Sequence, residues 1–186
     1  MEYQELILKR RSVRKYKDKE VPKELIIKLI KESTYAPSSG NEQPWRFIVV
    51  RDQAFMKAMS DEAKNTILNR IALNPNDYAK KYEKMLLNEQ YHIFYHAPAV
   101  VFIVGDKKLK NTKVNCALAA SYFMLSATSL GLGTCWINFA TAIESPEMLQ
   151  TLGIGHEDDI VAPIIVGYPE NVTQTMNRHE PDMTFI

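Results

Sequence analysis

Basic and hydroxyl side chains crowd residues 10–14, where Arg10, Arg11, Ser12 and Arg14 follow a short helix-patterned segment. Guanidinium groups bind phosphate and carboxylate oxygens through paired, charge-assisted hydrogen bonds, and a neighbouring hydroxyl adds a further donor. A solvated basic loop is the ordinary interpretation of such a run. A nucleic-acid arm is disfavoured because no second basic cluster or aromatic platform accompanies it. The sharper interpretation is a site for a small anion.

A second polar stretch, residues 37–45, lies between a helix pattern and the apolar run at 47–50. Pro37 ends the preceding helix, because proline lacks a backbone donor and clashes with the turn before it. The loop then offers the polar side chains of Ser38, Ser39 and Asn41. The same residue types dominate ordinary turns, so the loop becomes a candidate binding element only in combination with the other stretches.

A third stretch, residues 131–137, follows a long apolar helix pattern and continues into a strand pattern. Its Gly131-x-Gly133 pair resembles part of a dinucleotide-binding fingerprint, but that fingerprint lies between a strand and a helix, in the reverse order. A Rossmann-type site is therefore rejected. Trp136 is more typical of a core than of a catalytic group, so any binding role here is expected from the backbone.

His92 and His96 are four residues apart on an expected helix, a spacing that can chelate zinc. The glutamate that follows the first histidine in the familiar metalloprotease pattern is missing, and no Cys or His cluster supplies a third ligand. We therefore predict no metal site and interpret both histidines as packing or surface residues.

The chain has 186 residues, is 46% apolar and 24% charged, and carries a net charge of +1. These values predict one globular domain over residues 1–186, and no global field that attracts nucleic acid or an anionic membrane. Cys116 and Cys135 lie in apolar surroundings, which favours reduced thiols and a cytoplasmic protein. Residues 114–143 carry no charge, but their serines, threonines and glycines favour a buried helix and strand over a membrane span.

Hydrophobic spacing predicts helices near 3–10, 22–35, 52–95 with a break at 74–76, 114–130 and 145–153, and strands near 47–50, 99–104, 134–139 and 160–167. Asp52 is expected to cap the helix that follows it. The helix at 114–130 is expected to be buried on nearly all sides. Residues 52–96 form a helical excursion that we interpret as a candidate substrate lid.

Five motifs in a fixed order resemble the nitroreductase family of flavin enzymes over nearly the whole chain. They are Arg10-Arg11-Ser12-x-Arg14, Pro37-Ser38-Ser39-x-Asn41-x-Gln43-Pro44-Trp45, Ala97-Pro98, Gly131-Leu132-Gly133-Thr134-Cys135-Trp136-Ile137 and Val166-Gly167-Tyr168-Pro169. The resemblance implies an α+β, three-layer fold, in which helices flank a central, mainly antiparallel sheet. It also implies an intertwined homodimer, with the long helix at the interface and the C-terminal tail on the partner's sheet.

The resemblance further implies that flavin mononucleotide (FMN) lies at the dimer interface, and it assigns residues to the cofactor. Arg10, Arg11 and Ser12 would hold the phosphate and ribityl chain, and Arg178 would complete the phosphate site. Arg14 would lie near the pyrimidine edge of the ring. Pro37, Ser38, Ser39 and Asn41 would come from the other subunit, and the backbone of Trp136, Ile137 and Asn138 would face flavin N5. Asn138 stands where relatives commonly carry glycine, and no protein acid is singled out.

The implied activity is that of an FMN-dependent oxidoreductase. NADH or NADPH would deliver hydride to flavin N5, and an electron-poor acceptor such as a nitroaromatic or quinone would then take its place in a ping-pong mechanism. An enoate or dehalogenating reductase of the same family is an alternative, as is a flavin-binding, storage or regulatory protein with little turnover. Outside the resemblance, the basic N-terminal loop could serve a phosphate-ligand binding module.

Overall fold

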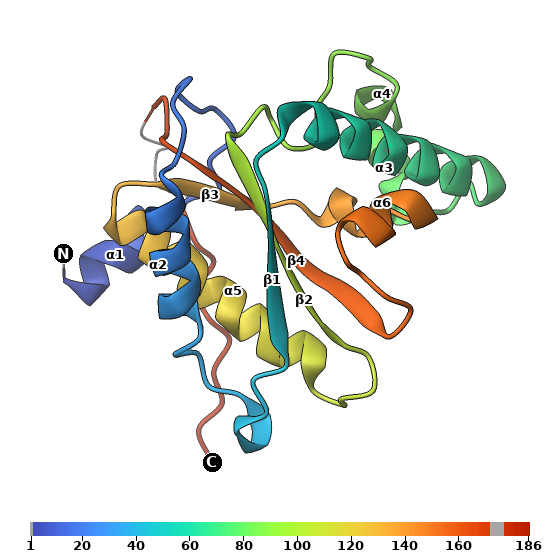
Figure 1. The fold of residues 1–186 in the computed structure, drawn as a ribbon. Coiled ribbons are helices and arrows are strands. Elements are labelled where there is room, and N and C mark those ends of the chain that lie inside the picture. Colours follow the sequence, from blue (N-terminus) through green and yellow to red (C-terminus); the bar gives the residue numbers. More distant parts are fainter. Residues whose placement is uncertain (1, 172–176) are drawn as a thin grey trace.

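The computed structural model describes residues 2–171 and 177–186 as an α+β fold around a four-stranded sheet (Figure 1). The α-helices are α1 (Tyr3–Lys9), α2 (Lys23–Ser33), α3 (Gln53–Leu73), α4 (Glu83–Leu86), α5 (Thr112–Ser129) and α6 (Pro146–Thr151). Short 3-10 helices are η1 (Ser39–Asn41), η2 (Tyr78–Tyr82) and η3 (Asn138–Ala142). The strands are β1 (Trp45–Val50), β2 (Ala99–Asp106), β3 (Gly133–Trp136) and β4 (Asp158–Gly167). They pair antiparallel in the order β1-β2-β4-β3.

Strand β2 crosses the middle of the sheet, and its side chains alternate between two apolar cores, one on each face. Phe102 packs in the core that contains Met59 of α3, whereas Ile103 packs in the core that contains Phe123 of α5. Helices therefore cover both faces of the sheet, as Figure 1 shows. This arrangement confirms the predicted three-layer fold with an antiparallel sheet.

Helix α5 presents small side chains to the sheet, which lets it approach closely. Its buried residues include Cys116, Ala119, Ala120, Phe123 and Ala127. Within one chain the helix is not buried on nearly all sides, because Val114, Leu118 and Tyr122 are 61%, 37% and 41% exposed, and the predicted burial across a dimer stays a prediction. Residues at this four-residue spacing share one face of a helix. A single chain thus leaves an apolar stripe of α5 in contact with solvent.

Three predicted element ends can be compared directly with the structure. The Asp52 carboxylate accepts a hydrogen bond from Phe55 N at 2.8 Å, which confirms the predicted cap of α3. Helix α3 ends at Leu73, where the Asn-Pro-Asn sequence was expected to interrupt it. The predicted strand at 134–139 is too long, because β3 ends at Trp136 and the backbone enters η3 at Asn138.

The helix expected around the two histidines is also wrong. Residues 91 and 92 have no regular structure and residues 93–96 form a turn, in which Tyr95 and His96 adopt positive φ angles of 51° and 52°. A right-handed helix excludes such angles. His92 is buried with its ring centroid 4.7 Å from that of His96. Packing of this kind agrees with the interpretation that these histidines are structural.

The described C-terminal stretch, residues 177–186, contains neither helix nor strand. It exposes the apolar side chains of Met183, Phe185 and Ile186. The expectation that this tail packs on a partner subunit stays a prediction. In the described ranges, no helix has the length and apolar content that crossing a membrane would require.

Candidate active site

The basic segment at residues 10–14 is held against the outer edge of β3. Ser12 forms an isolated parallel bridge with Thr134, and Val13 N donates to Thr134 O at 2.9 Å. Two glycines permit this contact. Gly131 ends α5 with a φ of 75°, and a Cβ added to Gly133 would lie 2.7 Å from the Val13 side chain. The glycine pair therefore serves close packing of the basic segment.

Two buried polar atoms beside this segment lack hydrogen-bond partners among the described residues. They are Nε of Arg11, whose Nη1 donates to Arg10 O at 2.5 Å, and Oγ1 of Thr134. A buried polar group without a partner costs about 1–3 kcal/mol, so native proteins usually satisfy it. Unsatisfied groups at the predicted anion site fit a ligand that brings phosphate or hydroxyl oxygens.

A cavity of 330 Å³ joins the basic segment to the end of β3. Its lining brings together Arg14 and the predicted residues Trp136, Ile137 and Asn138. The remaining lining residues are Tyr78, Tyr82, Met85, Tyr91, Ile93, Tyr95, Cys135 and Phe139. Sequence reasoning identified no individual residue of the excursion as part of the site. The available signal was four tyrosines at 78–95 within a stretch of irregular hydrophobic spacing.

Arg14 is the one charged side chain among the described residues that line this cavity. Burial raises the pKa of the Cys135 thiol, and the nearby Arg14 opposes that rise only in part. Burial also raises the pKa of Tyr91, whose hydroxyl donates to the Tyr95 hydroxyl at 3.2 Å. Since the thiol and phenol stay neutral at neutral pH, the cavity combines neutral aromatic walls with one fixed cation.

The loop at residues 37–41 lies elsewhere within the chain. Ser39 N donates to Asn115 Oδ1 at 3.1 Å in the first turn of α5, whereas Thr134 follows the other end of that helix. The 18 residues of α5 span about 27 Å at 1.5 Å per residue. Figure 1 shows η1 and β3 at opposite ends of the helix. One chain therefore does not bring Pro37, Ser38, Ser39 and Asn41 to the basic segment. Arg178 is exposed in the C-terminal stretch.

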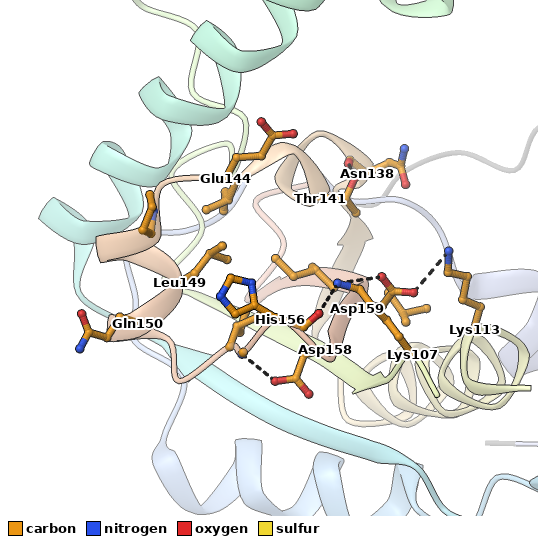
Figure 2. Close-up of a pocket in the computed structure, with 16 residues that line it drawn as sticks. Lys107, Lys113, Asn138, Thr141, Glu144, Leu149, Gln150, His156, Asp158 and Asp159 are labelled. Atoms are coloured by element: carbon orange, nitrogen blue, oxygen red, sulfur yellow. Dashed lines mark hydrogen bonds and ion pairs between the residues drawn. The ribbon is translucent and has the colours of Figure 1, made fainter. Parts of the chain in front are cut away.

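A larger groove of 820 Å³ shares Asn138 with the cavity and continues along α6 and the start of β4. Figure 2 shows Lys107 and Lys113 directed at Asp159, with Nζ–carboxylate distances of 3.9 and 3.3 Å. Because the Asp159 carboxylate lies close to both lysines, it balances part of their positive charge and makes the groove less suited to an anion. The unsatisfied groups at Arg11 and Thr134 mark the better place for an anion.

Comparison with known proteins identifies the family. The sequence model of the Nitroreductase family matches residues 7–168. The chain belongs to the nitroreductase family. The predicted family is thereby confirmed, and with it the prediction that the chain is an enzyme of the oxidoreductase class.

Individual proteins match almost the full chain. A protein of Archaeoglobus fulgidus, provisionally named NADH dehydrogenase/NAD(P)H nitroreductase, is 31% identical over 95% of this chain and 92% of its own length. An iodotyrosine deiodinase of Thermotoga neapolitana is 24% identical over 95% of this chain and 93% of its own. The crystal structure of a Bacteroides fragilis nitroreductase with bound FMN superposes with a TM-score of 0.85 and 26% identity, covering 100% of this chain and 99% of that one.

Proposed function

We propose that this nitroreductase-family chain is an FMN-dependent oxidoreductase that passes hydride from NADH or NADPH to an electron-poor acceptor. The observation that carries the proposal is the cavity shared by Arg14 and residues 136–138. Beside it lie Arg11 Nε and Thr134 Oγ1, which find no hydrogen-bond partner in the part of the chain that the structure describes and suit a phosphate and a ribityl chain. The FMN bound in the Bacteroides fragilis relative supports this choice of cofactor.

In this proposal, each part of the site has a separate task. Arg10, Arg11 and Ser12 bind the phosphate end, with Arg178 as a further cation. Residues 136–138 form the wall against which the flavin ring lies. Arg14 supplies positive charge for the ring, and a fixed charge of this kind acts strongly where water is excluded. When bound, FMN supplies the hydride chemistry, while the chain binds it, orients it and limits its contact with water.

We propose further that two copies of the chain complete each site. A second copy could bring its residues 37–41, including Ser38, Ser39 and Asn41, to the cofactor that Arg11 holds. Two observations support this arrangement. The loop and Arg11 lie at opposite ends of α5, and the exposed stripe of Val114, Leu118 and Tyr122 gives the helix an apolar face for a partner.

The residues that line the cavity also indicate which class of electron acceptor it suits. Its described lining contains Arg14 and aromatic rings but no carboxylate. A planar, neutral or anionic acceptor such as a quinone or nitroaromatic suits this surface. The Thermotoga neapolitana relative, an iodotyrosine deiodinase by name, makes reductive dehalogenation of a phenol the second candidate. Excursion residues that line the cavity, such as Tyr78 and Tyr82, would then act as the substrate lid.

Steady-state kinetics with reconstituted protein test the proposed reaction. NADH or NADPH is varied at several fixed concentrations of a quinone, a nitroaromatic or 3-iodotyrosine. We expect parallel double-reciprocal lines, because the donor must leave before the acceptor binds in the same cavity. Intersecting lines would contradict the ping-pong mechanism, and negligible turnover with every acceptor would favour a flavin-binding protein.

A further inference from the structure

We infer that Tyr95, itself held by Tyr91, is a positioning residue for Arg14. This inference rests on the proposed function, in which Arg14 serves the flavin ring. The Arg14 guanidinium carbon lies 5.7 Å from the centroid of the Tyr95 ring, within the range of a cation–π contact. The Tyr91 hydroxyl donates to the Tyr95 hydroxyl at 3.2 Å, and the two rings meet edge to face with centroids 5.8 Å apart.

Helix α3 fixes the backbone that carries these two tyrosines. Lys64 is only 6% exposed, and its Nζ donates to the carbonyl oxygens of Tyr91 at 3.0 Å and Asn88 at 2.9 Å. Ser60 Oγ, which is also buried, accepts from Ile93 N at 3.0 Å. A buried lysine devoted to two carbonyl groups is expensive to keep. Here Lys64 ties the backbone at residues 88–91, just before Tyr95, to the long helix α3.

The backbone at Tyr95 is strained. Tyr95 and His96 are consecutive non-glycine residues in the left-handed region, with φ angles of 51° and 52°. Such conformations persist where the surroundings impose them, and they often occur at functional sites. An ordinary φ at Tyr95 would redirect the chain and move its ring away from Arg14. The strain therefore keeps an aromatic face beside the cavity's cation.

Positioning matters because Arg14 is exposed and its side chain is long. A mobile guanidinium must be ordered each time negative charge develops on the ring, whereas a preorganised one needs no such rearrangement. The aromatic face of Tyr95 restricts Arg14 from one side. The Tyr91–Tyr95 pair should thus influence the midpoint potential of bound flavin only through Arg14.

The test is a double-mutant cycle on the flavin midpoint potential, measured anaerobically in FMN-loaded protein. We expect Arg14→Ala and Tyr95→Leu each to lower the potential, and the double variant to match Arg14→Ala alone. Tyr95→Phe keeps the ring and should retain nearly the wild-type potential. Tyr168→Leu is the matched control, because it removes a comparable cation–π contact, with Lys19 Nζ 4.3 Å from the Tyr168 ring centroid, and Tyr168 does not line the cavity. Its potential should stay unchanged.

The outcomes separate the inference from its premise. An unchanged potential in Arg14→Ala would contradict the proposed role of Arg14 at the flavin ring and, with it, the positioning role of Tyr95. A lowered potential in Arg14→Ala overturns the positioning role if Tyr95→Leu has no effect, or if the two effects add in the double variant. If Tyr95→Leu fails to fold or bind FMN, Tyr91→Leu carries the test, because it removes both the hydrogen bond and the edge-to-face ring contact that hold Tyr95. It should lower the potential in the wild-type background and leave it unchanged in the Arg14→Ala background, and any other result overturns the role.

Discussion

Replacing Gly133 with alanine tests how the chain holds its basic segment against β3. The added Cβ would lie 2.7 Å from the Cβ and Cγ2 atoms of Val13, closer than real side chains approach. Val13 or β3 must shift, and the shift threatens the Val13 N–Thr134 O hydrogen bond. Overpacking costs about 1–3 kcal/mol, and a hydrogen bond contributes about 1 kcal/mol. We expect the free energy of unfolding to fall by about 2–4 kcal/mol.

The same substitution should weaken FMN binding, because Ser12 and Arg11 adjoin Val13. Loss of one charge-assisted hydrogen bond to the phosphate costs about 1.5–3 kcal/mol, which corresponds to a dissociation constant about 10–150-fold higher. Urea unfolding and titration of apoprotein with FMN measure the two effects.

Gly155→Ala is the matched control for this experiment. The atom nearest to its added Cβ would be Asp158 Oδ2, at an ordinary contact distance of 3.8 Å. If Gly133→Ala equals this control in both stability and FMN affinity, the close approach of Val13 to β3 does not position the site, and the reasoning fails.

Three further predictions concern the dimer, the shared site and pH. Leu118→Glu puts a charge in the exposed stripe of α5 and should convert a dimer to a monomer in sedimentation equilibrium, and an unchanged mass would contradict the proposed interface. Arg11→Ala and Asn41→Ala chains should each bind FMN poorly, but their reassociated mixture should regain about a quarter of the sites, since half of the dimers are mixed and each holds one intact site. Burial and the neighbouring His96 lower the pKa of His92 from 6.5 to about 4. Because only the unfolded chain binds this proton between those values, stability should fall as pH drops through that window, by up to about 1.4 kcal/mol per pH unit, and His92→Gln should flatten the fall in urea unfolding.

The sheet and its main helices could be predicted because their signals are local. Ile103 and its neighbours form a continuous apolar run typical of a central strand, and Asp52 is a recognisable cap. The exposed stripe of α5 could not be recognised, since Leu118 and Tyr122 are as apolar as a core residue. Sequence alone gives no measure of which face of an apolar helix meets the sheet.

The candidate site likewise contains residues that the sequence could identify and residues that it could not. Arg14 and Trp136 belong to ordered motifs, so sequence comparison could place them in one site, and the structure brings them to one cavity. Tyr91 and Tyr95 could not be identified, because their approach to Arg14 depends on left-handed backbone at Tyr95 and on a buried lysine of α3. Neither feature has a local sequence signature, and the expected helix at this point was wrong.

The most direct test of the proposed function is the visible spectrum of the purified protein, supplied with FMN and followed before and after anaerobic addition of NADH and NADPH. We predict flavin bands that bleach with at least one nicotinamide and return when an acceptor is added. Bound flavin that neither nicotinamide reduces would contradict the proposed donor. Failure to bind FMN at all would contradict the assignment of Arg11, Arg14 and residues 136–138 to a flavin site.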